Sequence, residues 1–263
     1  MVPGVAGSYG TWWKWCHDLL DMAVETPGFE GRQSASDGLA ELILGWGASL
    51  VGFADLRGVA PSAFSHWPSA VSIVMELDSA ALAGVRDGPT VEYYEEYKRA
   101  NRALDEIAAR SADHINSLGH TAEVFPATIV DSSMGSDYQK TLSVGFQHKT
   151  AATRAGLGWI GKSALLVTSE FGSRVRLVTV FTDMPLNVAT PITEGRCGDC
   201  RACSRTCPAG AIKGREWRVG LPRAELVDVV ACRAKMRHLL LERVGVEDAV
   251  CGVCLSVCPV GVR

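Results

Sequence analysis

Eight cysteines in the last quarter of this 263-residue chain limit its fold and chemistry more than any other feature of the sequence. They form two motifs that each end in Cys-Pro, with one isolated cysteine between them. The first motif is Cys197-x2-Cys200-x2-Cys203-x3-Cys207, the second is Cys251-x2-Cys254-x3-Cys258, and the isolated residue is Cys232. Thiols this dense in a chain without an export signal indicate metal binding rather than disulfides.

The spacing is typical of a domain that binds two [4Fe–4S] clusters. Three closely spaced thiolates reach three irons of one cubane, and the cysteine before each proline ligates the other cluster. The sequence therefore predicts one cluster on Cys197, Cys200, Cys203 and Cys258. It predicts the other on Cys207, Cys232, Cys251 and Cys254. Zinc sites and disulfides are the alternatives, but zinc ribbons pair two CxxC units and do not produce this run.

The rest of the composition is that of an ordinary soluble protein. Apolar residues make up 47% and charged residues 21% of the chain. No apolar run approaches the roughly 20 residues needed to span a bilayer, and the first residues show neither a secretion signal nor a twin-arginine signal. We expect a cytoplasmic protein without a membrane partner, and we treat the ninth cysteine, Cys16, as an ordinary thiol.

Charge is distributed unevenly along the chain. Residues 196–263 carry 12 Lys and Arg against 7 Asp and Glu, whereas residues 1–195 carry 14 against 22. A basic face for an acidic partner or nucleic acid is one interpretation. The other, which we favour, is that the positive charge offsets the negative charge of the thiolate-ligated clusters.

Hydrophobic periodicity predicts a mixed fold before the cysteines begin. We expect helices at 34–47, capped by Ser36 or Asp37, and at 91–119, and another helix near the three early tryptophans. Strands are expected at 48–56, 70–78 and 120–127. Residues 128–147 are predicted to be a loop, and 148–168 to begin as a helix and end as a strand. A last strand, 171–186, should pair antiparallel with that strand through a turn at 170–173. A domain boundary is predicted near residue 190, which divides the chain into 1–190 and 191–263.

The run Ala155-Gly-Leu-Gly-Trp-Ile-Gly-Lys162, together with the double cysteine motif, resembles epoxyqueuosine reductases. The segment 170–186 also resembles part of the reductive dehalogenases. The resemblance implies an α+β chain: a nitroreductase-like α/β cobalamin-binding domain followed by a bacterial ferredoxin-like double [4Fe–4S] domain. It also makes Cys232 a cluster ligand. A cobalamin would lie beside the glycine run, held by Gly156, Leu157, Gly158, Trp159, Ile160, Gly161 and Lys162. The alternative is that these glycines serve the geometry of their own turn.

The proton donor is less well indicated than the clusters. Epoxyqueuosine reductases carry an aspartate shortly before the glycine run, and counting back places Leu142 there. His148 and Lys149 are candidate donors because both can release a proton near neutral pH when their surroundings allow it. Lys149 is also a candidate anchor for a corrin side chain or phosphate, and a solvated helix start is the alternative for both residues. Tyr138 is a third candidate, since reductive dehalogenases use a tyrosine.

These features favour a cobalamin-dependent reductase that acts on a small molecule or a modified nucleoside. The alternatives are a low-potential electron-transfer protein and a corrinoid-reducing or carrier protein with no substrate of its own. Expected partners are a ferredoxin- or flavodoxin-type electron donor and a small molecule or a corrinoid protein. Epoxyqueuosine reductases usually continue with a helical extension that helps to hold tRNA, whereas this sequence ends five residues after Cys258. With Leu142 at the aspartate position, we expect little activity on tRNA.

Overall fold

A four-stranded antiparallel sheet forms the centre of the computed structural model, which describes residues 29–128, 138, 142 and 144–261. The strand order is β1-β2-β6-β3, and each neighbouring pair is antiparallel. Their bounds are β1 Leu50–Asp55, β2 Ser69–Glu76, β3 Ala122–Phe125 and β6 Val175–Thr182.

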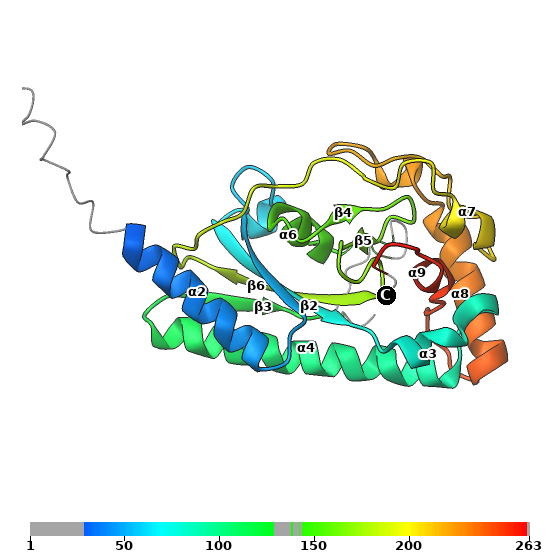
Figure 1. Cartoon of the computed structure of the whole chain (residues 1–263), viewed down its shortest axis with the longest axis horizontal. Helices are drawn as coiled ribbons and strands as arrows, with labels where there is room; N and C mark the ends of the chain where they lie inside the picture. Colours follow the sequence, from blue (N-terminus) through cyan, green and yellow to red (C-terminus); the bar gives the residue numbers. More distant parts are fainter. Residues whose placement is uncertain (1–28, 129–137, 139–141, 143, 262–263) are drawn as a thin grey trace, which may run out of the picture.

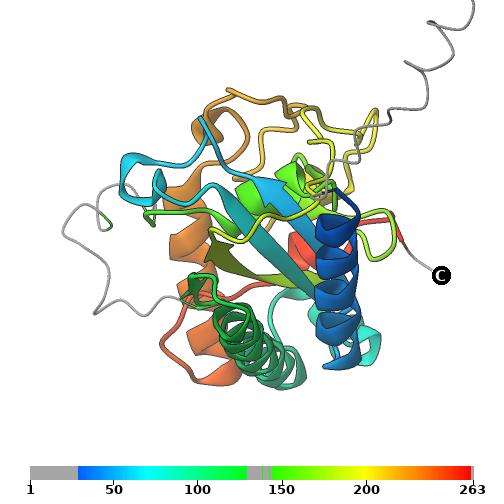
Figure 2. The same ribbon diagram turned by 90° about the vertical axis from the view of Figure 1, so that its left-hand side faces the viewer.

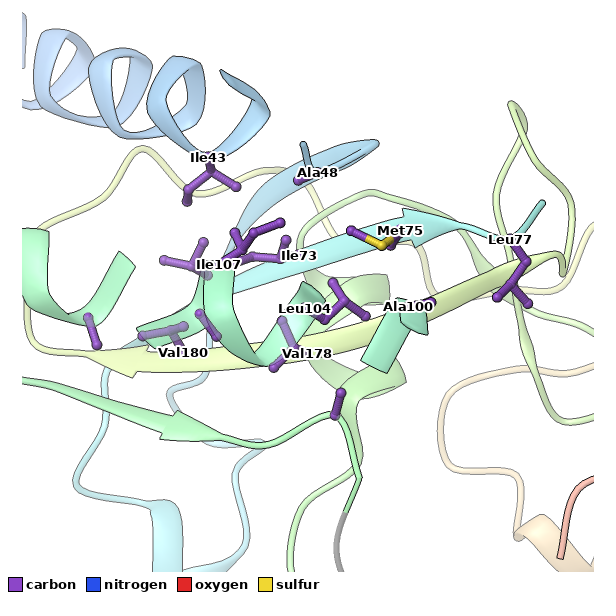
Figure 3. Packing of buried hydrophobic residues seen from close by; sticks show 14 of the residues in the cluster. Ile43, Ala48, Ile73, Met75, Leu77, Ala100, Leu104, Ile107, Val178 and Val180 are labelled. Atoms are coloured by element: carbon purple, nitrogen blue, oxygen red, sulfur yellow. The ribbon is translucent and has the colours of Figure 1, made fainter. Parts of the chain in front are cut away.

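Two helices, α2 (Phe29–Gly45) and α4 (Val91–Ser117), cover one face of the sheet (Figures 1 and 2). Leu104 and Ile107 of α4 pack on Ile73 and Val178 of the central strands, as Figure 3 shows. All four side chains are at most 3% exposed, so this layer is a continuous apolar core.

The other face is covered by α6 (His148–Arg154) and by a small hairpin of β4 (Trp159–Ile160) and β5 (Leu166–Val167). Side chains of a strand alternate between the two faces of its sheet. Val71 and Ile73 of β2 therefore join the α4 core, whereas Ala70 and Val74 face α6. Because both faces are covered, β2 is buried along almost its whole length.

The cysteine-rich end packs onto one end of this sandwich. After β6 the chain runs back along the top of the molecule to α7 (the yellow segment in Figure 1). The helices here are α7 Ala202–Thr206, α8 Val229–Val244 and α9 Val253–Ser256. Leu240 and Leu255 belong to the same core as α4. The Arg174 guanidinium donates to the carbonyl oxygens of Cys258 at 2.8 Å and Val260 at 2.7 Å. The division at residue 190 stays a prediction, and the two parts share one core.

The shorter elements are α3 (Ser79–Ala83) and the 3-10 turns Ser62–Phe64, Val85–Asp87 and Arg223–Glu225. Among the described residues, no helix is both long and apolar enough to cross a membrane.

The mixed helix-and-sheet architecture is confirmed, and the specific relation to nitroreductases stays a prediction. The helix at 91–119 is found with Thr90 as its cap, which accepts from Tyr93 N–H at 3.2 Å, and with Gly119 in the left-handed conformation after its end. The strands at 48–56, 70–78 and 120–127 are confirmed in shorter form.

Two local predictions were wrong. Ser36 and Asp37 do not cap a helix, because α2 begins earlier, at Phe29; Ser36 Oγ instead accepts from Asn187 N–H at 2.8 Å. The strand at 171–186 pairs with β2 and β3 rather than with its predecessor, since β6 is central to the sheet. Only an isolated bridge between Thr168 and Gly172 remains of the predicted pairing. The predicted N-terminal helix, Cys16 and most of the 128–147 loop lie outside the described residues.

Candidate functional site

The first motif and the last cysteine of the chain meet at the start of α7. Burial, together with the neighbouring Cys197, Cys200 and Cys258 thiols, raises the pKa of the Cys203 thiol to about 11. The backbone folds tightly here, with Cys200 N–H donating to Cys197 O at 3.1 Å. The structure thus brings together the four residues that spacing assigned to one cluster.

The remaining four thiols surround a cavity of about 280 Å³ between α8 and α9. Cys232 lies on α8, whose first turn is capped by the Asp228 carboxylate. Burial, with the neighbouring Cys207 and Cys251 thiols, raises the pKa of Cys232 to about 11. Burial also raises the pKa of Cys254, which has thiols of both motifs around it. All eight are free thiols.

Partly buried thiols that lie near one another are costly as thiolates unless a cation compensates their charge. Iron bound by thiolates supplies that compensation, and it deprotonates the ligands that it binds. The donor set therefore fits iron–sulfur clusters. A zinc ribbon requires two CxxC pairs to converge on one ion. Here each group of four thiols instead contains cysteines of both motifs.

Lys162 belongs to the first cysteine loop rather than to an open cofactor surface. Its Nζ donates to the carbonyl oxygens of Gly198 and, at 3.2 Å, Cys200, and it lies 3.6 Å from Glu216 Oε2. Glu216 Oε1 accepts from Cys197 N–H at 2.8 Å. Lys162 and Glu216 together hold the loop that carries the first thiols.

The glycines of the predicted cofactor run contact their own chain. A Cβ on Gly158 would lie 2.2 Å from Val167 O, and a Cβ on Gly161 would lie 2.7 Å from the Val167 side chain. Gly156 has φ +69°, a conformation that favours glycine. Because glycine has no Cβ, these residues let β4 lie against β5. This supports the alternative interpretation of the sequence, in which the glycines serve the geometry of their own turn.

The other residues of the run divide between the two faces of the hairpin. Ile160 lines a cavity of about 510 Å³ beside α6. Trp159 is buried, with the Arg196 guanidinium 5.9 Å from its ring centre, and its indole N–H bonds to none of the described residues. Leu157 packs among apolar side chains next to α6. The structure thus places Ile160, and not the glycines, at a cavity wall.

His148 is fully engaged by the protein. Its Nε2 lies 3.0 Å from Pro126 O, which can only accept, so Nε2 carries the proton. Its Nδ1 then accepts from the Thr179 hydroxyl at 2.8 Å. Burial lowers the pKa of His148 to about 4. A neutral histidine with both nitrogens occupied is poorly suited to deliver a proton.

Lys149 lies between two cavities. It lines both the 510 Å³ cavity and a smaller one of about 180 Å³ that also includes His148 and Arg176. Its Nζ donates to Ala164 O at 2.8 Å. Burial lowers the pKa of Lys149 to about 8, and the positive charge of Arg223 adds to the shift. Lys149 is a half-buried side chain with a hydrogen bond inside the protein, not part of a solvated helix start.

Neither Tyr138 nor Leu142 is among the described residues that line these two cavities. The Arg233 guanidinium lies 5.4 Å from the centre of the Tyr138 ring. Leu142, at the position of the family's aspartate, has φ +48°, and its carbonyl accepts from Arg223 at 2.9 Å. Residues other than glycine rarely adopt a positive φ.

Sequence reasoning missed four charged residues: Arg154, Arg176, Glu216 and Arg223. None stands in a motif. Only Arg154 lies beside the glycine run, where its position directly before Ala155 was the available signal.

Residues 196–261 match the family model of the 4Fe-4S double cluster binding domain, which defines the class of the cysteine-rich part. More than half of the chain is similar in sequence to epoxyqueuosine reductases, so the resemblance is confirmed. The enzyme of Pseudomonas aeruginosa is 28% identical over 163 residues, covering 62% of this chain and 40% of the relative. That of Salmonella typhimurium is 31% identical over 141 residues, covering 51% and 32%. The chain thus spans well under half of these relatives.

Solved structures share the fold. The reductive dehalogenase NpRdhA, in complex with 3-bromo-4-hydroxybenzoic acid, has a TM-score of 0.68 at 22% identity, covering 88% of this chain and 32% of that chain. An epoxyqueuosine reductase with a tRNA stem loop has a TM-score of 0.57 at 19% identity, covering 87% and 65%. Both families anticipated from the glycine run and the segment 170–186 therefore have the same fold.

Proposed function

We propose that this chain is a cobalamin-dependent oxidoreductase that passes single electrons through two [4Fe–4S] clusters to a bound corrinoid. The observation that carries the proposal is that Leu165, Arg176 and Leu255 line both the thiol cavity and the 180 Å³ cavity. Lys149 and Ala164 in turn line both the 180 Å³ cavity and the 510 Å³ cavity. The 180 Å³ cavity thus lies between a cluster in the thiol cavity and a ligand in the 510 Å³ cavity, and electron transfer requires such proximity.

The cluster ligands are those assigned by spacing. Cys197, Cys200, Cys203 and Cys258 bind one cluster, and Cys207, Cys232, Cys251 and Cys254 bind the other. The grouping of the thiols in space supports this assignment. The second cluster is the one next to Lys149, so it is the one that delivers electrons to the corrinoid. The first cluster then receives them from a ferredoxin- or flavodoxin-type donor.

The residues present fit a corrinoid at the 510 Å³ cavity rather than at the glycines. Ile160 and Ala164 of the hairpin contribute apolar side chains to the lining of this cavity, and Gln147 and Thr150 contribute polar groups. A reductive dehalogenase structure with the same fold is described as B12-dependent. When bound, the cobalt supplies the electron-transfer and substrate-reduction chemistry. This chain's own residues bind and orient the reactants and exclude water.

Lys149 holds the proton at this site. Its Nζ lies at the border of the two cavities, and a pKa of about 8 makes its proton transferable near neutral pH. His148 instead fixes Pro126 and Thr179 and so positions the start of α6. Tyr138 stays a second candidate donor.

The substrate is a small molecule, and the protein acts in the cytoplasm. We expect little conversion of epoxyqueuosine in a tRNA anticodon stem-loop, because Leu142 has no ionisable group. Robust turnover of that stem-loop would overturn this expectation and identify tRNA as the substrate.

An anaerobic absorption spectrum with iron, sulfide and cobalt analysis tests the proposal. We expect about eight irons per chain and one cobalt after incubation with micromolar cobalamin. About four irons or fewer after reconstitution would contradict the two clusters. Full iron without cobalt would leave a low-potential electron-transfer protein. Cobalt bound but no reductive turnover with any electron acceptor would favour a corrinoid carrier.

A further inference from the structure

Two residues directly before β6 hold the segment that carries the last cysteine of the chain. The Ser173 hydroxyl donates to Leu255 O at 3.2 Å. The Arg174 guanidinium donates to Cys258 O at 2.8 Å and to Val260 O at 2.7 Å. All three acceptors are backbone carbonyls, so these hydrogen bonds fix the course of the chain on both sides of Cys258.

Glycines allow the two segments to approach this closely. A Cβ on Gly172 would lie 2.2 Å from Val260 O, and a Cβ on Gly261 would lie 2.5 Å from Glu170 O. The two glycines have φ values of +57° and +64°, which residues with a Cβ rarely adopt. Both sides of the contact are therefore shaped for direct packing of one backbone against the other.

Arg174 is itself held by the central sheet. Its carbonyl accepts from Leu77 N–H at 2.9 Å, which continues the pairing of β2 and β6 by one residue. Its own N–H donates to Phe171 O at 3.1 Å, and the next residue, Val175, is buried. The half-buried Arg174 side chain thus extends from a fixed point. Because a guanidinium donates from a rigid planar fork, its two carbonyl acceptors are held in register with the sheet.

Cys258 is the thiol of the first group that depends most on such a support. Cys197, Cys200 and Cys203 come from one loop, so their spacing alone keeps them together. Cys258 comes from the other motif and reaches the Cys203 thiol only in the folded chain. It follows α9, which ends at Ser256, so it lies outside the regular elements of this segment.

We propose that Arg174 is a positioning residue of the first cluster: it holds Cys258 within reach of the iron, and its positive charge favours the reduced cluster. The inference rests on the proposed function, because it takes Cys258 as a ligand of that cluster. Groups that bind a metal-ligating residue orient it. The charge and hydrogen bonds around a cluster set its reduction potential. Reduction adds one negative charge, so a neighbouring cation makes it easier.

Iron analysis and an EPR-monitored redox titration of the full chain, after anaerobic reconstitution, test the inference. The first-cluster signal is the one that Cys197→Ser changes. In Arg174→Met we expect its midpoint potential to fall by about 59 mV, a tenfold change in the one-electron equilibrium, or the iron to fall from about eight to about four per chain. Arg174→Lys keeps the charge and should restore most of either loss. Full iron with an unchanged potential in Arg174→Met would overturn the inference.

Two controls remove a positive charge from α4 instead. Arg110→Met affects a guanidinium 4.2 Å from the centre of the Trp46 ring, and Lys98→Met affects an ion pair with Glu95 on the helix surface. Both variants should keep full iron and both midpoint potentials. A shift of the first-cluster potential in these variants as large as in Arg174→Met would overturn the inference, because any lost charge would then have the same effect.

A second pair of variants decides the question if Arg174→Met takes up no iron at all. Lysine and glutamine at this position can each donate to one of the two carbonyls, but only lysine carries a charge. We expect a lower first-cluster potential in Arg174→Gln than in Arg174→Lys. Equal potentials in these two variants would contradict the electrostatic role.

Cys258→Ser separates the failure of this inference from the failure of the ligand assignment. If Cys258→Ser changes the first-cluster signal but Arg174→Met changes neither iron nor potential, the assignment stands and the role of Arg174 is wrong. If Cys258→Ser leaves that signal unchanged, the assignment under the proposed function is itself wrong, and the role of Arg174 fails with it.

Discussion

Lys162 Nζ lies 3.6 Å from Glu216 Oε2, and this pair connects the glycine hairpin to the first cysteine loop. Lys162 is almost buried, and its Nζ also binds the carbonyl oxygens of Gly198 and Cys200, while Glu216 accepts from Cys197 N–H. The sequence assigned Lys162 to a corrin, whereas in the structure it holds the loop that carries Cys197 and Cys200.

Lys162→Met should weaken the first cluster, because two loop carbonyls and one carboxylate lose the cation between them. We expect iron to fall from about eight to about four per chain, or the remaining cluster signals to shift in midpoint potential. Iron analysis and EPR after anaerobic reconstitution measure both. Lys213→Met, an exposed lysine in the same segment, is the control. Full iron and an unchanged potential in Lys162→Met would rule out the positioning role.

Serine substitutions test the ligation across the two motifs. Cys258→Ser should affect the same EPR signal as Cys197→Ser, although the two residues belong to different motifs. Cys232→Ser should affect the other signal and lower iron to about four per chain. Cys16→Ser should leave both clusters intact. If Cys258→Ser and Cys251→Ser affect one signal together, the ligands do not cross.

Lys149→Met should stabilise the protein at neutral pH, because the variant no longer buries an ammonium. The folded-state pKa, about 8, lies below the ordinary value of 10.5, so the unfolded chain binds more protons between these pH values. The penalty is full below pH 8 and disappears as the pH rises through 10.5. The difference between variant and wild type should therefore fall from about 3 kcal/mol towards zero.

Anaerobic thermal unfolding at pH 7 and pH 10 measures this difference. Lys98→Met should change stability by no more than about 0.5 kcal/mol. A Lys149→Met protein that is less stable than the wild type at pH 7 would show that the lysine serves the fold.

His148 should stay neutral throughout the physiological range. Its folded-state pKa of about 4 lies below the ordinary 6.5, so the stability that neutral His148 contributes is present above pH 6.5 and is lost as the pH falls towards 4. Nitrogen-15 NMR of the imidazole should show a proton on Nε2 and no titration above pH 5. Titration near 6.5 would return His148 to the candidate proton donors.

Gly158→Ala should disrupt the hairpin, since the new Cβ would lie 2.2 Å from Val167 O. We expect a loss of about 3 kcal/mol or more in the free energy of unfolding. Gly38→Ala in α2 is the control, because no atom lies within 4 Å of its added Cβ, and it should stabilise by about 0.5–1 kcal/mol. A stable Gly158→Ala protein that loses only cobalamin binding would support the corrin cradle predicted from sequence.

The helices and strands before residue 190 were largely predictable, because the spacing of apolar residues indicates which face of a helix or strand is buried. The long helix at 91–117 was found with both its cap and its stop. The pairing of β6 was not predictable from its neighbours in sequence. Its position between β2 and β3 depends on contacts with strands far away in the chain: α4 and α6 separate β2 from β6, and α6 separates β3 from β6.

By itself, the sequence determined the chemistry of the cysteine-rich end, because the spacing of thiols along a short loop decides which irons they can reach. Only the tertiary structure gives the surroundings of Lys149, Lys162 and His148. Their burial and partners come from segments that meet only in the folded chain, and that environment shifts the pKa of Lys149 and gives Lys162 its loop carbonyls.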